Sequence, residues 1–366
     1  MSYDLPAIEK LWLGEGSIVC IPPNRLVDCF NACEDVLGRD WVEGTKTREF
    51  GTGTGPLVTL SIAGVGARLI PVMHARGFGK LAARLRKEER SAFSELTAAY
   101  LCLNGQRDVR LEFEEPVPVD DSVKLPDFRL AAPGEDWTYI EVAAPDRSDA
   151  NKDAAGVMTA LSEELWVLPS NATIEILLLR VPLEHESRSI AKRALALAEK
   201  AMPVDEELDG LAVISVNSAS PCVIEGRNYR DRVGPVLGIA KTFTRHGKPD
   251  KHVVVRVPII DERAEEVLSR EARQLPKTHA GLLMFDVNSN ASAFRDWPPL
   301  LESRLQPRLH TRVGAICIFH SGSSLTPAGE GIITETRVLT NSHAAIAVPH
   351  WLTAQLERQS GVPHGA

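Results

Sequence analysis

Two acidic residues mark a predicted hairpin in residues 124–145, KLPDFRLAAPGEDWTYIEVAAP. Asp127 follows Pro126 at the head of the first predicted strand, and Glu141 stands inside the second, TYIEVA. A carboxylate inside so apolar a strand is costly to bury unless another group pairs with it. Two carboxylates on adjacent strands can share a divalent cation, and such a cation can activate water against a phosphodiester. The two acids therefore predict a metal site.

The residues around these acids favour strand, turn and strand. Residues 131–136, AAPGED, carry the Pro and Gly that are typical of a turn. Because successive side chains of a strand point to opposite faces, residues 138–143 divide between the two faces of the predicted sheet. The alternation puts Tyr139, Glu141 and Ala143 on one face and Ile140 and Val142 on the other.

Helical patterns stand on both sides of the hairpin. Residues 91–103, SAFSELTAAYLCL, predict a helix that carries one acid, Glu95. A short strand is predicted at residues 109–113, and residues 148–165 predict a further helix after the Glu141 strand. The order is therefore helix, strand, Pro-Asp strand, Glu strand and helix.

This order resembles the core of the PD-(D/E)XK nuclease superfamily, the restriction-endonuclease-like fold, over about residues 91–180. The resemblance implies that Asp127 belongs to the PD motif and that Glu141 opens the (D/E)XK motif. It implies Mg²⁺ or Mn²⁺ on Asp127 and Glu141, with the Val142 carbonyl completing the shell and Glu95 as a further ligand or as a group that orients water. The implied activity is hydrolysis of phosphodiester bonds in nucleic acid, with DNA expected before RNA.

The motif lysine of this superfamily is missing, because position 143 is Ala143. That lysine normally orients or activates the attacking water and steadies charge in the transition state. Some members supply the cation from a neighbouring element, and the candidates here are Lys152, Arg147 and Lys124. Lys152 is preferred, because the first turn of the following helix can point back at the strand end. The alternative is a catalytically inactive nuclease-fold subunit that serves as a nucleic-acid-binding or protein-binding scaffold.

The densest basic stretch, residues 76–90, leads into the helix that carries Glu95. Arg84 and Lys87 in this stretch, together with Arg147, are the predicted contacts to nucleic-acid phosphates. An ordinary solvated helix face stays open as the other explanation for this stretch. Residues 241–252, KTFTRHGKPDKH, interleave cations with an aromatic and predict a mobile basic loop, which either grips nucleic acid or is merely solvated.

Composition sets outer limits on function. The 366-residue chain has a formal net charge of −8, so bulk charge does not make it a polyanion binder and any nucleic-acid contact must be local. No apolar run reaches membrane-spanning length, and the N-terminus lacks the layout of a signal peptide. None of the six cysteines forms a CxxC pair, which favours reduced, buried thiols over a zinc site. A cytoplasmic protein without a membrane partner is expected.

The alternation of elements predicts an α/β fold, a mixed sheet with flanking helices. Residues 1–75 are expected to form an α+β accessory module, with strands in residues 57–70, LVTLSIAGVGARLI. Residues 76–215 would form the restriction-endonuclease-like core, and residues 216–366 a C-terminal α/β extension that enlarges the sheet. A protein partner, a homo-oligomer and a role in defence against foreign DNA stay open at this point.

Overall fold

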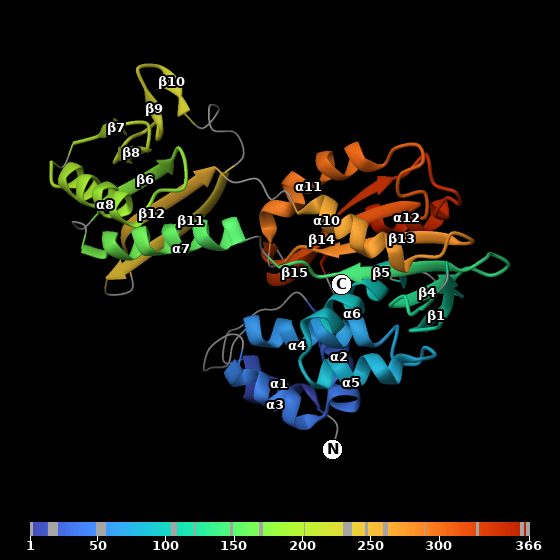
Figure 1. Ribbon diagram of the computed structural model, residues 1–366. Coiled ribbons are helices and arrows are strands. Elements are labelled where there is room, and N and C mark those ends of the chain that lie inside the picture. The colour runs from blue at the N-terminus through green and yellow to red at the C-terminus, as the bar shows by residue number, and fades with distance from the viewer. Residues whose placement is uncertain are drawn as a thin grey trace. The chain divides into compact units, whose positions relative to one another are not determined.

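The chain forms two compact units in the computed structural model (Figure 1). The first unit combines Met1–Asp146 with Arg263–Ala366, and the second is Arg147–Glu262, so the second is inserted into the first. The structure describes residues 3–13, 21–48, 56–103, 108–120, 122–146, 149–167, 171–200, 202–229, 236–245, 248–258, 263–288, 290–326, 329–358 and 362–363.

A seven-stranded mixed sheet lies at the centre of the first unit. In sheet order its strands are β1 (Arg110–Phe113), β4 (Phe128–Ala131), β5 (Thr138–Ala143), β13 (Ala280–Asp286), β14 (Ala315–Thr326), β15 (Gly329–Thr340) and β16 (Val362–Pro363). Strand β4 is antiparallel to β5, whereas β5, β13 and β14 run parallel. A small separate hairpin joins β2 (Val117–Val119) to β3 (Ser122–Lys124).

Helices cover both faces of this sheet, which confirms the predicted mixed sheet with flanking helices. Ile140 and Met284 pack with apolar residues of α2, α4, α6 and α12, while Ala143 and Leu283 pack with α10 and α11. The helices of this unit are α1 (Leu5–Ile8), η1 (Glu9–Leu13), α2 (Pro23–Leu37), α3 (Arg39–Arg48), α4 (Pro56–Leu69), α5 (Phe78–Arg86), α6 (Arg90–Leu103), α10 (Ala264–Glu271), η3 (Ala272–Gln274), α11 (Ala291–Arg304) and α12 (His350–Arg358). Among the helices that the structure describes, none is long and apolar enough to cross a membrane.

The strands predicted in residues 57–70 are wrong, because this segment lies in helix α4. In the described part of residues 1–75 we find helices and no strand of the expected α+β module. The sequence misled because α4 is buried on most sides, and a helix that is apolar all round lacks the periodic stripe that separates helix from strand.

Gly66 lets α4 lie directly against α2. A Cβ atom at this position would meet the backbone oxygen of Cys29 at 2.1 Å, which is far inside van der Waals contact. We expect Gly66→Ala to lower the free energy of unfolding by about 1–3 kcal/mol, because the two helices must separate. Urea unfolding measures the change. Gly79→Ala is the matched control, since a Cβ at Gly79 meets nothing within 4 Å, and an equal loss in both variants would contradict the explanation.

The second unit is a five-stranded sheet with two helices on one face. Its strands, in sheet order, are β11 (Val236–Arg245), β12 (Lys248–Pro258), β6 (Thr173–Leu178), β8 (Ala212–Val216) and β7 (Val204–Leu208). Helices α7 (Asp149–Glu164) and α8 (Glu184–Ala198) pack on Ile174, Ile176 and Val255. The turn η2 (Leu165–Val167) follows α7, and a small hairpin joins β9 (Val223–Ile224) to β10 (Arg227–Asn228).

The described part of the basic segment, residues 241–245 and 248–252, does not form the predicted mobile loop. These residues lie in the antiparallel strands β11 and β12, where Lys241 pairs with Val253. Strand β12 also pairs with β6 on its other side, so its backbone donors and acceptors are satisfied by neighbouring strands. The charged residues made this segment resemble a loop in the sequence. The pairing of β12 with the distant strand β6 leaves no local signal.

The predicted core, residues 76–215, is divided between the two units. Strand β5 belongs to the first unit, whereas α7 and β6 belong to the second, where β6 is a strand of the five-stranded sheet. The strand that runs parallel beside β5 is β13, and α10 precedes it. Local pattern could not foresee this, because β6 and β13 are both short, almost wholly buried apolar strands.

Candidate acidic site

Asp127 is held against the backbone of β5. The Val142 N–H donates to Asp127 Oδ2 at 2.7 Å. The Glu114 N–H, just beyond β1, donates to the carbonyl oxygen of Asp127 at 3.0 Å. These two bonds fix the carboxylate at the entrance of β4, next to the strand that carries Glu141.

One carboxyl oxygen of Glu141, Oε2, is buried and has no hydrogen-bond partner among the residues that the structure describes. Burial, followed by the nearby charge of Asp127, raises the pKa of Glu141 to about 10. Glu141 therefore carries a proton at neutral pH in the metal-free protein.

Four carboxyl groups act on one another here, and we call them the acidic cluster: Glu95, Asp127, Glu141 and Glu271. Burial and then the charge of Glu95 raise the pKa of Asp127 well above its usual value. Burial also raises the pKa of Glu95, although Arg84 opposes the shift. The three predicted acids are thus brought into one electrostatic neighbourhood within the first unit.

Glu271 is the member of this cluster that the sequence did not predict. It is buried at the end of α10, 8% exposed, and accepts a hydrogen bond from Arg270 Nε at 2.6 Å. Its charge raises the pKa of both Asp127 and Glu141, after the effect of burial. No local signal separates Glu271 from Glu265 and Glu266 on the same helix, because only the packing of α10 on β5 places it here.

Arg84 is part of this site and not a free surface cation. Its Nη2 and Nη1 donate to the two oxygens of Glu95 at 2.6 and 2.8 Å, and its Nε donates to Glu89 at 3.1 Å. Its Nη1 also lies 3.6 Å from Glu114 Oε1. The predicted phosphate contact of Arg84 stays a prediction, and so does that of Lys87, which is exposed just after α5.

The described residues contain no group of three or more His, Cys, Asp or Glu side chains arranged to hold a metal ion. Glu95, the third expected ligand, has both oxygens bound by Arg84. Asp127 and Glu141 nevertheless fit a cation, because Glu141 keeps a buried oxygen with no partner and a divalent ion binds carboxylate oxygens. The predicted three-ligand set remains a prediction.

Two of the three cations predicted to replace the missing lysine, Lys152 and Lys124, lie among the described residues. Lys152 lies on α7 in the second unit, 56% exposed, with its Nζ 3.3 Å from Asp149 Oδ1. Arg147 falls outside the described residues, and Lys124 ends strand β3. The catalytic role of Lys152 stays a prediction. Ala143 itself is buried, 6% exposed, among the apolar residues that face α10 and α11.

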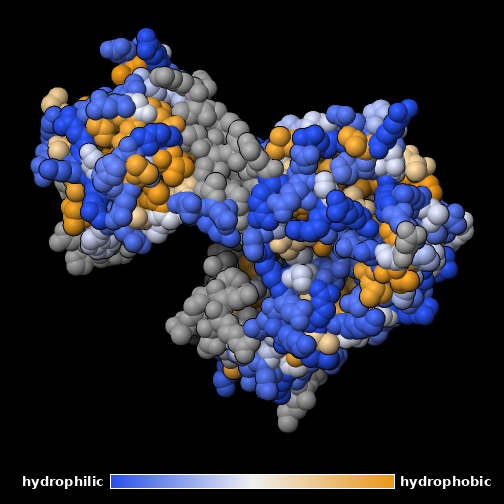
Figure 2. Space-filling view, in the orientation of Figure 1, coloured by the Kyte–Doolittle hydropathy of each residue, from blue (hydrophilic) through white to orange (hydrophobic). Residues whose placement is uncertain are grey.

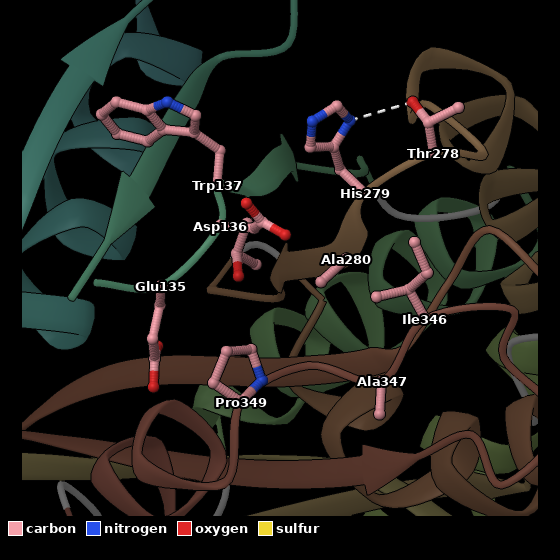
Figure 3. A pocket seen from close by; sticks show the side chains of 10 residues that line it. Glu135, Asp136, Trp137, Thr278, His279, Ala280, Ile346, Ala347 and Pro349 are labelled. Carbon is pink, nitrogen blue, oxygen red and sulfur yellow. Dashed lines mark hydrogen bonds between the residues drawn. The ribbon is translucent and has the colours of Figure 1, made fainter. Parts of the chain in front are cut away.

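A pocket of about 220 Å³ lies at the opposite end of the same strands (Figure 3). Thr138 and Ala280, paired where β5 and β13 begin, both line it. Figure 3 shows Trp137 and His279 on one side and Pro349 on another. No member of the acidic cluster lines this pocket.

Figure 2 shows mainly hydrophilic side chains over α10 in the first unit.

No protein-family model matches the chain, and neither the curated proteins nor the solved structures give a match. The resemblance to the nuclease superfamily therefore stands on the motifs of this sequence alone.

Proposed function

We propose that the protein is a metal-dependent nuclease, in which Asp127 and Glu141 bind Mg²⁺ or Mn²⁺ and nucleic acid, DNA first, is the substrate. The observation that carries this proposal is the buried, unpartnered Oε2 of Glu141 among the carboxyl groups of the acidic cluster. Neighbouring buried carboxyl groups resist ionising together, and a divalent cation removes that conflict.

The order of elements in the first unit supports the proposal. Helix α6 is followed by β1, the β2–β3 hairpin, and the antiparallel strands β4 and β5, which agrees with the helix, the strands and the two acids that the resemblance uses. The helix expected next, residues 148–165, is α7 of the second unit, and in the first unit the chain continues after that insertion with α10 and the parallel strand β13. A restriction-endonuclease-like core is thus part of the proposal.

Each residue has a distinct part in the proposed mechanism. Asp127 and Glu141 would hold the ion, and Glu95 and Glu271 add negative charge beside them. When bound, Mg²⁺ or Mn²⁺ would lower the pKa of a water molecule and screen the charge of a phosphate. The Val142 N–H keeps Asp127 Oδ2 in place, so the carboxylate needs little reorganisation. Glu141 must give up its proton before it can act as a ligand.

We expect the purified protein to cleave at least one of four substrates, single- or double-stranded DNA or RNA, in Mg²⁺ or Mn²⁺ and none in EDTA. Gel analysis of end-labelled substrates measures cleavage, and calorimetry with Mn²⁺ alone measures binding of the ion. Intact substrates in both metals, together with no uptake of Mn²⁺, would refute the proposal.

The second candidate is a catalytically inactive scaffold of the same fold. The buried alanine at position 143 favours it, because no lysine stands where the resembling family has one. Such a scaffold binds nucleic acid or a protein without cleaving phosphodiesters. Nucleic-acid binding that is equal in EDTA and in Mn²⁺, without product, would identify it.

A further inference from the structure

We infer that Arg84 takes over the transition-state charge that the motif lysine supplies in the nuclease superfamily that the sequence resembles. In the metal-free protein Glu95 accepts hydrogen bonds from the Arg84 guanidinium, and a phosphate of the substrate replaces Glu95 when substrate binds. The inference rests on the proposed function and deepens it by naming the missing cation.

A short path of contacts places Arg84 beside Asp127. Its Nη1 lies 3.6 Å from Glu114 Oε1, and the backbone N–H of Glu114 donates to the carbonyl oxygen of Asp127 at 3.0 Å. The positive charge of Arg84 also acts on the Asp127 carboxyl group.

Among the partners of Arg84, which include Glu89 and Ser91, Glu95 is of a kind that a phosphate can replace. Arg84 holds Glu95 through two parallel N–H donors, and the same fork fits two oxygens of a phosphate. The Arg84 side chain is 27% exposed, whereas the Glu95 side chain is only 3% exposed. An incoming phosphate can therefore approach Arg84 from solvent, while Glu95 faces the acidic cluster.

The helix that carries Arg84 is fixed to the strand beside Asp127. Gly77, at φ +80°, begins α5, and a Cβ there would meet the carbonyl oxygen of Phe113 at 2.4 Å. The rings of Phe78 and Phe113 lie 6.0 Å apart in a T-shaped contact. These contacts hold α5 on β1, so Arg84 is presented by a rigid element.

A guanidinium differs from an ammonium in one respect that can be measured. Arginine stays protonated at all working pH values, so it acts by charge and cannot serve as a general base. Arg84 would therefore lower the activation barrier for cleavage without causing kcat to fall at alkaline pH. Glu95, released from Arg84, would then be free to join Asp127 and Glu141.

Arg84→Ala tests the inference through two readouts that move in opposite directions. We expect kcat to fall by about 100-fold or more, with little change in KM, because the lost charge acts in the transition state. We expect Mn²⁺, titrated alone by calorimetry, to bind more tightly, because a cation has left the acidic cluster. Arg84→Lys should keep more turnover than Arg84→Ala, and its kcat should fall at alkaline pH. Thermal unfolding confirms that each variant is folded.

Arg39→Ala is the matched control, since Arg39 is an exposed arginine paired with Glu43 at 2.9 Å on α3. A rise in KM at constant kcat, or unchanged turnover in Arg84→Ala, would overturn the inference while leaving the nuclease proposal intact. A large loss of kcat in Lys152→Ala alone would transfer the role to Lys152. Absence of cleavage by the wild-type protein would remove the proposed function, and the inference with it.

Discussion

Glu141→Gln is expected to reduce metal-dependent cleavage by about 100-fold or more, because removing one metal ligand forfeits several kcal/mol of transition-state stabilisation. The amide keeps the size of the side chain but cannot bear the negative charge that the ion needs. The same substitution should not destabilise the metal-free protein at neutral pH. There the Glu141 carboxyl group already carries a proton, since burial and Asp127 raise its pKa to about 10. An amide therefore replaces a neutral group.

The measurement combines cleavage assays with thermal unfolding in EDTA. Glu302→Gln, at an exposed position on α11, is the control and should leave both unchanged. Asp127→Ala should also abolish cleavage, but it removes the acceptor of the Val142 N–H and so should cost some stability. Full cleavage by Glu141→Gln would move the active site away from the acidic cluster.

The central pair of the site could be predicted because its signals are local. The Pro-Asp start of one strand, the turn residues and the acid inside an apolar strand all lie within residues 124–145. The structure confirms that β4 and β5 are adjacent and antiparallel. Glu95 was placed on its helix by the same kind of local pattern, and its charge reaches Asp127.

The remaining parts of the site depend on contacts between distant segments. Glu271 joins the cluster only because α10 packs on β5, although the whole second unit separates these two elements in the sequence. Arg84 was predicted as a phosphate contact from its charge alone, and the sequence could not show that Glu95 binds it in the absence of substrate. Strand β13 lies parallel beside β5, whereas β6, the next long apolar strand in the chain, pairs with β12 in the second unit. The sequences of β6 and β13 are both apolar, so only tertiary packing determines which of them pairs with β5.

The metal-free protein is expected to lose stability as the pH rises from about 5.5 to about 8.5, by on the order of 1 kcal/mol per pH unit for each carboxyl group that keeps its proton only in the folded state. The sign follows from the raised pKa of about 10 for Glu141. Between the unfolded value and this folded value, the folded state binds more protons than the unfolded state, so raising the pH favours unfolding. Asp127, whose pKa is also raised by burial and by Glu95, acts in the same direction.

Thermal unfolding in EDTA across this pH range measures the effect, and saturating Mn²⁺ should reduce it. The bound ion takes the place of the protons and stabilises the folded state by mass action, and it binds more tightly at higher pH because its ligands must be deprotonated. Glu141→Gln should flatten the dependence in EDTA, because its amide does not titrate. A melting temperature that is constant or rises with pH in EDTA would show that Glu141 is ionised without a metal. The buried oxygen would then have a partner other than a proton, and the principal reason for placing a divalent ion at Asp127 and Glu141 would be gone.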